Sequence, residues 1–358
     1  MKALRILAGP VAMQHIRQHG LQAQDIGVIP GAAGGPKGLI LGPLDRHLFG
    51  TWLPQSKQPV HLVGASIGAW RLASACLNDP VQALQQLEHD YIHQDYKIPP
   101  RQKRPSAEQV SREFGAALNA FYGGRVHEIL NHPRFRLHVM TSHGRHVLAQ
   151  DGPWRTALGY AMAYGANAIQ RRWLGLFLER VVFSSQPEWG LPFDARDFRT
   201  HQIALTADNF MQAVQASCSI PFVLQAVRDI PQAPAGAYWD GGITDYHLHL
   251  DYRAAPGLVL YPHFQPHVVP GWLDKALKWR HPATDFLNRM VLLCPKPEWV
   301  ARLPQGKLPD RTDFVTHAHD VAKRIQVWQQ AVAQAQQLAD EWQAWLQQPD
   351  LYDVEPLP

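Results

Sequence analysis

The sequence feature that most constrains the fold is a Gly-x-Ser-x-Gly pentapeptide, GASIG, at residues 64–68. A short, β-branched and apolar segment precedes it, and residues 69–76 have the composition of a helix. We therefore expect a strand that turns sharply into a helix at Ser66, with glycines where the backbone passes close to itself. The helix N-terminus would favour a developing negative charge beside the serine hydroxyl. The pattern predicts a nucleophilic serine, and a purely structural turn is the alternative.

A glycine-rich loop lies before this turn. The apolar residues 26–29 predict a strand that leads into PGAAGGPKG at residues 30–38, and an apolar helix follows. The glycine spacing matches neither a phosphate-binding loop nor a dinucleotide fingerprint. A loop between strand and helix can still direct several backbone N–H groups at an oxyanion. One helix and one strand separate this loop from Ser66, so we expect the two strands to be adjacent and parallel.

Composition limits the class of protein. The chain of 358 residues is 46% apolar and 18% charged, which excludes a disordered chain. No uncharged apolar run is long enough to span a bilayer, and Gly9 and Pro10 interrupt the N-terminal apolar stretch, so a signal peptide is not expected. The three cysteines show no metal-type spacing and are expected to be buried. We expect a cytoplasmic protein.

The charge pattern argues against nucleic acid as a partner. The net charge is only +4, and basic residues cluster at a single place, formed by Arg101, Lys103 and Arg104. Such a short cluster is most simply a solvated surface, although an anionic lipid surface would also suit it.

Helices and strands alternate along most of the remaining chain. Helices are expected at residues 10–20 and through residues 80–130, where Ser106 and Gln109 form a capping box. Strands are expected at residues 135–140, 201–205, 258–260 and 290–293. The tail from Val321 to Leu346 reads as a long amphipathic helix that docks on the domain.

Residues 156–183 form an apolar segment that we expect to be helical. Its apolar side chains cover well over half of the helical circumference, which is wider than one buried face requires. One interpretation is a helix buried between the sheet and another helix. The other is a cap or lid that borders an acyl-chain pocket or contacts a membrane surface.

An Asp-Gly-Gly sequence, residues 240–242, follows the apolar residues 237–239. Two glycines leave the carboxylate of Asp240 uncovered by neighbouring side chains, which suits either a turn or a base that approaches a hydroxyl. Shortly afterwards His247, His249 and Asp251 lie on one face of an extended segment. Solvated or core side chains with this spacing are more common than ligands, and we predict no metal site.

Taken together, four signals resemble the patatin-like phospholipases. They are the glycine-rich loop, the GASIG turn, the run ASCSIPF at residues 216–222 and the Asp-Gly-Gly sequence, in that family's order across residues 26–242. The resemblance implies a three-layer α/β/α sandwich with a mostly parallel central sheet. It also implies a lipid acyl hydrolase that uses a Ser-Asp dyad without histidine, with Ser66 as the nucleophile, Asp240 as the base and no cofactor.

The resemblance also assigns an oxyanion hole. Residues Gly34, Gly35, Lys37 and Gly38 resemble the family's Gly-Gly-x-[Arg/Lys]-Gly segment. The segment departs from the family in two ways: Ala33 replaces the family's first glycine, and the aspartate that often precedes the run is absent. The intervening Pro36 has no N–H to donate. The donors must therefore come from Gly34, Gly35 or Lys37.

The complete prediction is one patatin-like α/β domain spanning residues 1–358. It has helical insertions near residues 80–130 and 151–190 and a C-terminal helix near residues 320–347. The expected function is hydrolysis of (phospho)lipid esters, with transient contact with a membrane surface. Two alternatives remain: a non-catalytic lipid- or protein-binding module on the same fold, and a Ser-His-Asp esterase of non-lipid substrates, since the chain has 19 histidines.

Overall fold

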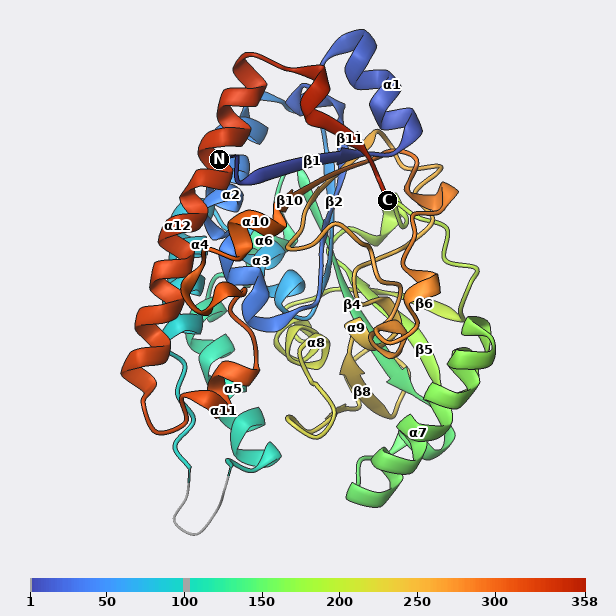
Figure 1. Cartoon of the computed structure of the whole chain (residues 1–358). Coiled ribbons are helices and arrows are strands. Elements are labelled where there is room, and N and C mark those ends of the chain that lie inside the picture. The colour runs from blue at the N-terminus through green and yellow to red at the C-terminus, as the bar shows by residue number, and fades with distance from the viewer. Residues whose placement is uncertain (1, 99–103) are drawn as a thin grey trace.

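The structure, a computed structural model, describes residues 2–98 and 104–358. Of the basic cluster noted above, Arg101 and Lys103 lie outside the described residues. Within them, eleven strands form a single sheet (Figure 1). These strands are β1 (Leu4–Ala8), β2 (Ile26–Gly31), β3 (Val60–Ala65), β4 (Phe135–Gly144), β5 (Leu178–Ser184), β6 (Thr200–Ala204), β7 (Val227–Arg228), β8 (Ala237–Asp240), β9 (Leu258–Pro262), β10 (Met290–Pro295) and β11 (Val354–Pro356).

The sheet is mostly parallel, as the sequence predicted. The strand order is β11-β1-β10-β9-β2-β3-β4-β5-β6, with β8 joined to β4 and β7 to β8. The central neighbours from β10 through β9, β2 and β3 to β4 are all parallel. The predicted adjacency of the first two motif-bearing strands is confirmed, because β2 and β3 pair with Gly31 opposite Gly64. Every residue of β2, β3 and β4 is buried, which is typical of strands covered on both faces.

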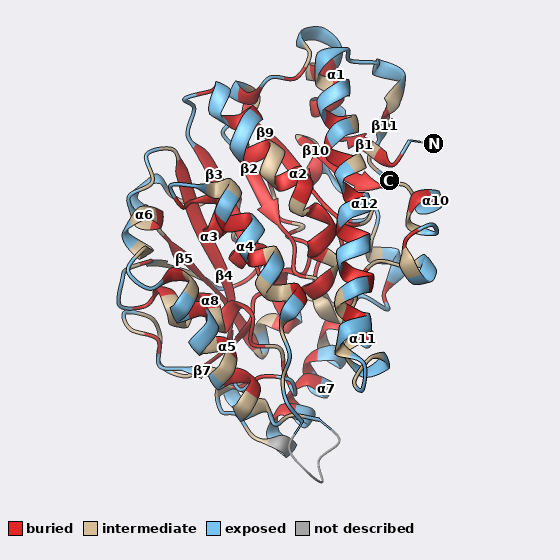
Figure 2. Ribbon diagram, turned by 90° about the vertical axis from the view of Figure 1, so that its left-hand side faces the viewer, coloured by how far each residue is buried: buried red, intermediate tan, exposed pale blue. Residues whose placement is uncertain are grey.

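Helices complete the three-layer α/β/α arrangement. Figure 2 shows α2, α3, α4 and α12 packed over one face of the sheet. The other face is covered largely by α9 and by irregular chain with short 3₁₀ turns (Figure 1). The helices are α1 (Pro10–His19), α2 (Gly42–His47), α3 (Ile67–Ala75), α4 (Pro80–His93), α5 (Ala107–Tyr122), α6 (Val126–Leu130), α7 (Pro153–Ile169), α8 (Phe210–Ser217), α9 (Gly242–Asp245), α10 (Pro297–Val300), α11 (Thr312–Thr316) and α12 (Val321–Gln347).

Two helices before β4 begin at residues whose side chains cap them, the second at the predicted Ser106. The carboxylate of Asp79 accepts a hydrogen bond from the N–H of Gln82 at the start of α4, at 2.9 Å. The hydroxyl of Ser106 accepts one from the N–H of Gln109 at the start of α5, at 3.1 Å. Each bond satisfies an N–H group that the first helical turn leaves free.

The C-terminal helix α12 docks on the body of the protein, as predicted. Its apolar stripe is buried, and the ring of Trp342 packs edge-on against Trp52 with 5.7 Å between centroids. The indole N–H of Trp328 donates a 2.9 Å hydrogen bond to the buried carboxylate of Asp313, so this tryptophan is buried without leaving its polar atom unpaired.

The prediction for residues 156–183 is wrong in its second half. Helix α7 ends at Ile169, the 3₁₀ turn η6 covers Arg171–Leu176, and the chain then forms β5 between β4 and β6. Residues 181–183 read Val-Val-Phe and are fully buried. A short continuous apolar run of this kind cannot be assigned to helix or strand by periodicity, and here its β-branched residues favour the strand.

The first of the two interpretations of the helical half, burial between the sheet and another helix, is also wrong. Helix α7 does not lie between the sheet and another helix, because Trp154, Leu158 and Ile169 are 87%, 57% and 72% exposed. The apolar side chains of α7 instead divide between a side that packs against the protein and a side that faces solvent.

Candidate active site

Ser66 lies on the sharp strand-to-helix turn that the sequence predicted. It follows β3 directly, precedes α3, and has a positive φ of 56°. A β-carbon on Gly64 would lie 2.5 Å from the Cα of Ala69, and one on Gly68 would lie 1.8 Å from the carbonyl oxygen of Gly31. Both glycines are therefore required by close backbone contact. Such a sparsely populated conformation costs a non-glycine residue about 1–3 kcal/mol, so the surrounding packing must hold the serine in it.

The hydrogen bonds of Ser66 connect it to two other elements. Its Oγ donates to Oδ2 of Asp240 at 2.6 Å, and its backbone N–H donates to Oγ of Ser217 at 2.9 Å. The Ser217 hydroxyl in turn donates to the carbonyl oxygen of Met140 at 2.7 Å. Ser217, at the end of α8, thus links the turn to β4.

Strand β4 explains why Ser66 and Asp240 meet. Along one edge of β4, β3 runs parallel and ends with Ala65 opposite Met140. On the same edge β8 runs antiparallel and ends with Asp240 opposite Thr141, while β5 occupies the other edge. The two strands therefore approach each other end to end, which brings Ser66 and Asp240 to adjoining positions.

Asp240 is buried and held at both carboxylate oxygens. Besides the bond from Ser66, its Oδ1 accepts a hydrogen bond from the N–H of Gly242 at 2.7 Å. Burial raises the pKa of Asp240, and this outweighs the lowering effects of the Ser66 hydrogen bond and of the nearby Arg311 charge. A carboxylate with a raised pKa is a better proton acceptor than a solvated one.

The two glycines after Asp240 do more than leave a carboxylate open. A β-carbon on Gly241 would lie 2.1 Å from the carbonyl oxygen of Met140, and one on Gly242 would lie 2.5 Å from Cβ of Ala33. The Asp-Gly-Gly segment is thus packed between β4 and the glycine-rich loop. Helix α9 follows, and its Asp245 receives two hydrogen bonds, of 2.8 and 2.6 Å, from the fully buried Arg180 of β5.

The glycine-rich loop borders the same site. Gly34 and Lys37 line the pocket beside Asp240, whereas Gly38 packs against Ile67, the residue after Ser66, and Gly35 has a positive φ of 57°. The Gly34 N–H has no acceptor in the described part of the chain. The 3₁₀ turn η2 begins at Gly35, and the N–H groups at the start of such a turn have no partner within it. The loop therefore offers free donors next to the serine turn.

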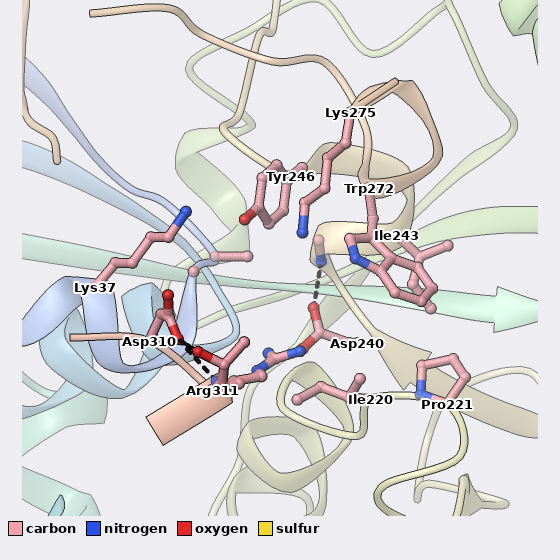
Figure 3. Close-up of a pocket in the computed structure, with 14 residues that line it drawn as sticks. Lys37, Ile220, Pro221, Asp240, Ile243, Tyr246, Trp272, Lys275, Asp310 and Arg311 are labelled. Carbon is pink, nitrogen blue, oxygen red and sulfur yellow. Dashed lines mark hydrogen bonds between the residues drawn. The ribbon is translucent and has the colours of Figure 1, made fainter. Parts of the chain in front are cut away.

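A pocket of about 230 Å³ opens at this point. It is bordered by the glycine-rich loop, the Asp-Gly-Gly segment, the end of the ASCSIPF run and two segments that no motif indicated, residues 272–275 and 310–312 (Figure 3). Its lining residues are Ala33, Gly34, Lys37, Ile220, Pro221, Asp240, Gly242, Ile243, Tyr246, Trp272, Lys275, Asp310, Arg311 and Thr312.

Three cationic side chains surround the pocket. Figure 3 shows the amines of Lys37 and Lys275 directed toward the space beside Asp240, with the Arg311 side chain extending toward Asp240 from another side. None of the three forms an ion pair within 4 Å with any residue that the structure describes. Asp310, the other acid of the lining, is paired with Lys307 instead. The pocket therefore presents unpaired positive charge.

The environment of Lys275 changes its protonation. Its ammonium lies 4.1 Å from the centroid of the Tyr246 ring. Partial burial, together with the positive charges of Arg311 and Lys37, lowers the pKa of Lys275 to about 7. Burial also lowers the pKa of Lys37. Sequence reasoning missed Lys275 and Arg311, because neither belongs to a motif or to a periodic pattern.

No histidine of the described residues hydrogen-bonds to Ser66 or Asp240 or lines the pocket. His247 accepts a 3.1 Å hydrogen bond from the N–H of Val269, and His249 hydrogen-bonds with the carbonyl of Val268 at 2.8 Å. Asp251 pairs with Arg253. Across residues 2–98 and 104–358 no group of three or more His, Cys, Asp or Glu residues could hold a metal ion. Over the same residues no helix is long and apolar enough to cross a membrane.

Comparison with known families identifies this arrangement. A family model described as patatin-like phospholipase matches residues 33–247, more than half of the chain. The chain belongs to the patatin-like phospholipase family. This family consists of lipid acyl hydrolases, so the resemblance inferred from the four motifs is confirmed. Comparison with curated proteins found no match, and neither did comparison with solved structures. Lys275 and Arg311 lie outside residues 33–247, the part of this patatin-like chain that the family model matches.

Proposed function

We propose that this protein is a serine acyl hydrolase of lipid esters, with Ser66 as nucleophile and Asp240 as base. The observation that carries the proposal is the 2.6 Å hydrogen bond from Ser66 Oγ to Asp240 Oδ2 in a buried site. As Oγ bonds to the ester carbonyl carbon, its proton moves to Oδ2. When the tetrahedral intermediate collapses, the ester C–O bond breaks and this proton passes to the departing alkoxide.

The second half of the reaction uses the same groups. Water attacks the acyl-serine ester and gives its proton to Asp240, and the proton then returns to Ser66 Oγ as the fatty acid leaves. The raised pKa of Asp240 favours the two steps in which it accepts a proton, first from Ser66 and then from water. Asp240 remains oriented throughout because the Gly242 N–H holds its other oxygen.

Backbone donors of the glycine-rich loop would stabilise the oxyanion in both halves. Gly34 and Gly35 are the strongest candidates, because the Gly34 N–H has no acceptor in the described residues and the N–H of Gly35 opens η2. Lys37 contributes positive charge from its side chain. Gly38 is expected to contribute through its position beside Ile67, the residue that follows Ser66.

The charge of the pocket supports an ester with an anionic head group. Unpaired Lys37, Lys275 and Arg311 surround the space next to Asp240. Cations in a partly desolvated pocket attract a phosphate or carboxylate more strongly than they would in water. A phospholipid, whose phosphate lies a few bonds from its ester, fits this arrangement better than a neutral glyceride.

The decisive experiment combines active-site labelling with hydrolysis. A fluorophosphonate probe with intact-mass detection is expected to label the parent protein once, at Ser66, and to leave Ser66→Ala unlabelled. On a panel of p-nitrophenyl esters and phospholipids, Ser66→Ala and Asp240→Asn are each expected to lose at least about a thousandfold in kcat. His247→Ala and His249→Ala serve as matched controls and should retain turnover.

Two outcomes would contradict the proposal. If a histidine variant were inactive and folded while Asp240→Asn kept most of its activity, the protein would be a Ser-His-Asp esterase. If the parent neither reacted with the probe nor cleaved any ester, while Ser66→Ala bound lipid as well as the parent, the protein would be a binding module.

A further inference from the structure

Helix α7 presents large apolar side chains to solvent. Trp154, Leu158 and Met162 are spaced four residues apart and lie on one stripe of the helix, which Ile169 continues at its C-terminal end. All four are exposed. In η6, directly afterwards, Trp173 and Leu176 are exposed as well. Monomeric proteins rarely leave so many large apolar side chains together on one surface, and such a surface marks an interaction site.

The side of α7 that faces the protein combines smaller or polar residues with one large ring, that of Tyr160, which is buried near Trp239. Gly159, Ala163 and Asn167 are buried. Asn167 donates a 2.8 Å hydrogen bond to the carboxylate of Asp274, which is fully buried. Most of the large apolar side chains of α7 therefore face solvent, contrary to the usual arrangement of a surface helix. Packing against the protein does not explain why the outer residues are apolar.

The charges on this segment have one sign. Between Gly152 and Leu178 there are three arginines and no acid. Arg155 and Arg172 are exposed, whereas Arg171 is committed to Asp274 at 2.7 Å. The acids of the surroundings, Glu179 and Asp274, are buried and paired with arginines, and Asp151 lies just before the helix. An exposed apolar face with basic neighbours is typical of helices that lie in the surface of an anionic membrane.

The apolar surface continues to the entrance of the pocket. Ile220 and Pro221 line the pocket, and the next two residues, Phe222 and Val223, are 50% and 46% exposed. Phe222 is held with a positive φ of 69°, and its ring lies 6.3 Å from that of Tyr160 of α7. A bulky side chain kept outside in a strained conformation is unusual and points to a use for its exposure.

The protein-facing side of α7 also reaches the pocket wall. Asp274, which binds Asn167 and Arg171, belongs to the 3₁₀ turn η8 (Trp272–Asp274). Its neighbours Trp272 and Lys275 line the pocket. Helix α7 and the pocket wall are thus joined through one buried carboxylate.

We propose that the outer face of α7, together with Phe222 and Val223, docks on the surface of an anionic lipid bilayer. This contact places the pocket entrance against the layer that contains the ester substrate. The use of this contact rests on the proposed function, because it would bring the pocket to its ester substrate. Binding to the bilayer itself requires no turnover.

The experiment measures binding with the inactive Ser66→Ala protein. Sedimentation with vesicles of phosphatidylcholine and phosphatidylglycerol at 7:3 is expected to pull down the protein, with much weaker binding to phosphatidylcholine alone. Adding Leu158→Glu or Ile169→Glu is expected to weaken binding by about tenfold or more. The matched control is Tyr352→Glu, an exposed aromatic residue just before β11, and it should bind as the parent does. Figure 1 shows β11 and α7 at opposite ends of the molecule.

Three results would overturn the proposal: no binding to either vesicle, equal binding by the α7 variants and the parent, or a dimer in sedimentation velocity that Leu158→Glu dissociates without affecting vesicle binding. The last result would make the face a subunit interface. Hydrolysis of soluble short-chain esters by the Ser66 protein is measured separately. Hydrolysis without vesicle binding refutes only the docking surface, and vesicle binding without hydrolysis refutes only the proposed function.

Discussion

The carbonyl oxygen of Gly31 lies where a β-carbon on Gly68 would have to stand, only 1.8 Å from that position. Gly31 ends β2 at the start of the glycine-rich loop, while Gly68 lies in the first turn of α3, directly after Ser66 and Ile67. The two structures that would supply the oxyanion hole and the nucleophile are therefore in direct backbone contact. Their relative position depends on the absence of one methyl group.

We predict that Gly68→Ala loses most activity and is strongly destabilised, because the backbone of β2 or α3 must move. A matched control is Gly165→Ala in α7, where nothing lies within 4 Å of an added β-carbon. That change is expected to stabilise the protein by up to about 1 kcal/mol, since alanine is the better helix former. Urea unfolding and ester hydrolysis check both variants. Full activity in Gly68→Ala would contradict the importance of this contact.

The pH dependence of hydrolysis should follow Asp240. Only the deprotonated carboxylate can accept the Ser66 proton, so kcat is expected to fall as the pH drops through the pKa of Asp240, which burial raises above 3.8. The inflection should remain in His247→Ala and in His263→Ala. A profile whose acidic limb disappeared in either histidine variant would assign the inflection to that histidine.

The cations of the pocket should affect anionic substrates selectively. Lys275→Gln and Arg311→Gln are each expected to raise KM for an anionic ester by about tenfold, with little change for a neutral ester of equal chain length. Because the pKa of Lys275 is about 7, its charge is present below that pH and lost above it. KM for the anionic ester should therefore rise between pH 6 and 8 in the parent but less in Lys275→Gln. Equal effects on the two esters would argue for a general packing role.

A buried ion pair connects α2 to α3, the helix that follows Ser66. Arg71 donates two 2.7 Å hydrogen bonds to the carboxylate of Asp45, and both side chains are almost completely buried. Asp45→Ala leaves the guanidinium without its partner and is expected to lower the free energy of unfolding by about 3–5 kcal/mol. Asp353→Ala, which removes an exposed pair with Lys2, should cost less than about 1 kcal/mol. Similar losses in both variants would contradict the role of burial.

Buried histidines should make the protein sensitive to acid. Burial lowers the pKa of His61 to about 4 and that of His263 to about 3. In the unfolded chain these groups titrate near 6.5, so between that value and their folded pKa the unfolded state binds more protons. The free energy of unfolding should therefore fall as the pH drops below about 6.5, by up to about 1.4 kcal/mol per pH unit for each such histidine. Urea titrations at pH 7, 6 and 5 measure the slope, which His263→Asn should reduce. A flat profile over this range would contradict the prediction.

The serine turn and the Asp240 segment could be predicted from the sequence. In both, the backbone passes so close to other atoms that only glycine fits, and the glycines therefore recur at fixed positions in the motif. Gly64 and Gly68 mark the serine turn, and Gly241 and Gly242 mark the approach of Asp240 to the same place. Lys275 and Arg311 could not be predicted. They come from irregular segments after β9 and β10, and only the tertiary fold brings them to the pocket.

The fold shows the same division. The alternation of apolar strands and helices predicted the central sheet, whereas β5 was mistaken for helix because Val181 and its neighbours are buried on both sides. The wide apolar circumference of α7 is evident from the sequence, but burial and exposure of that helix were both compatible with it. Hydrophobic periodicity gives the direction of an apolar face relative to its own helix, and it carries no information on whether protein or solvent lies opposite.

The end-to-end approach of β3 and β8 along β4 has a consequence for how the protein acquires activity. Ser66 and Asp240 are 174 residues apart in the chain, and their hydrogen bond requires that both strands have already paired with β4. Contacts over such sequence separations form slowly, because a long loop must close first. During refolding, ester hydrolysis would thus appear only in molecules that have completed this junction, whereas helix content measured by circular dichroism would recover earlier.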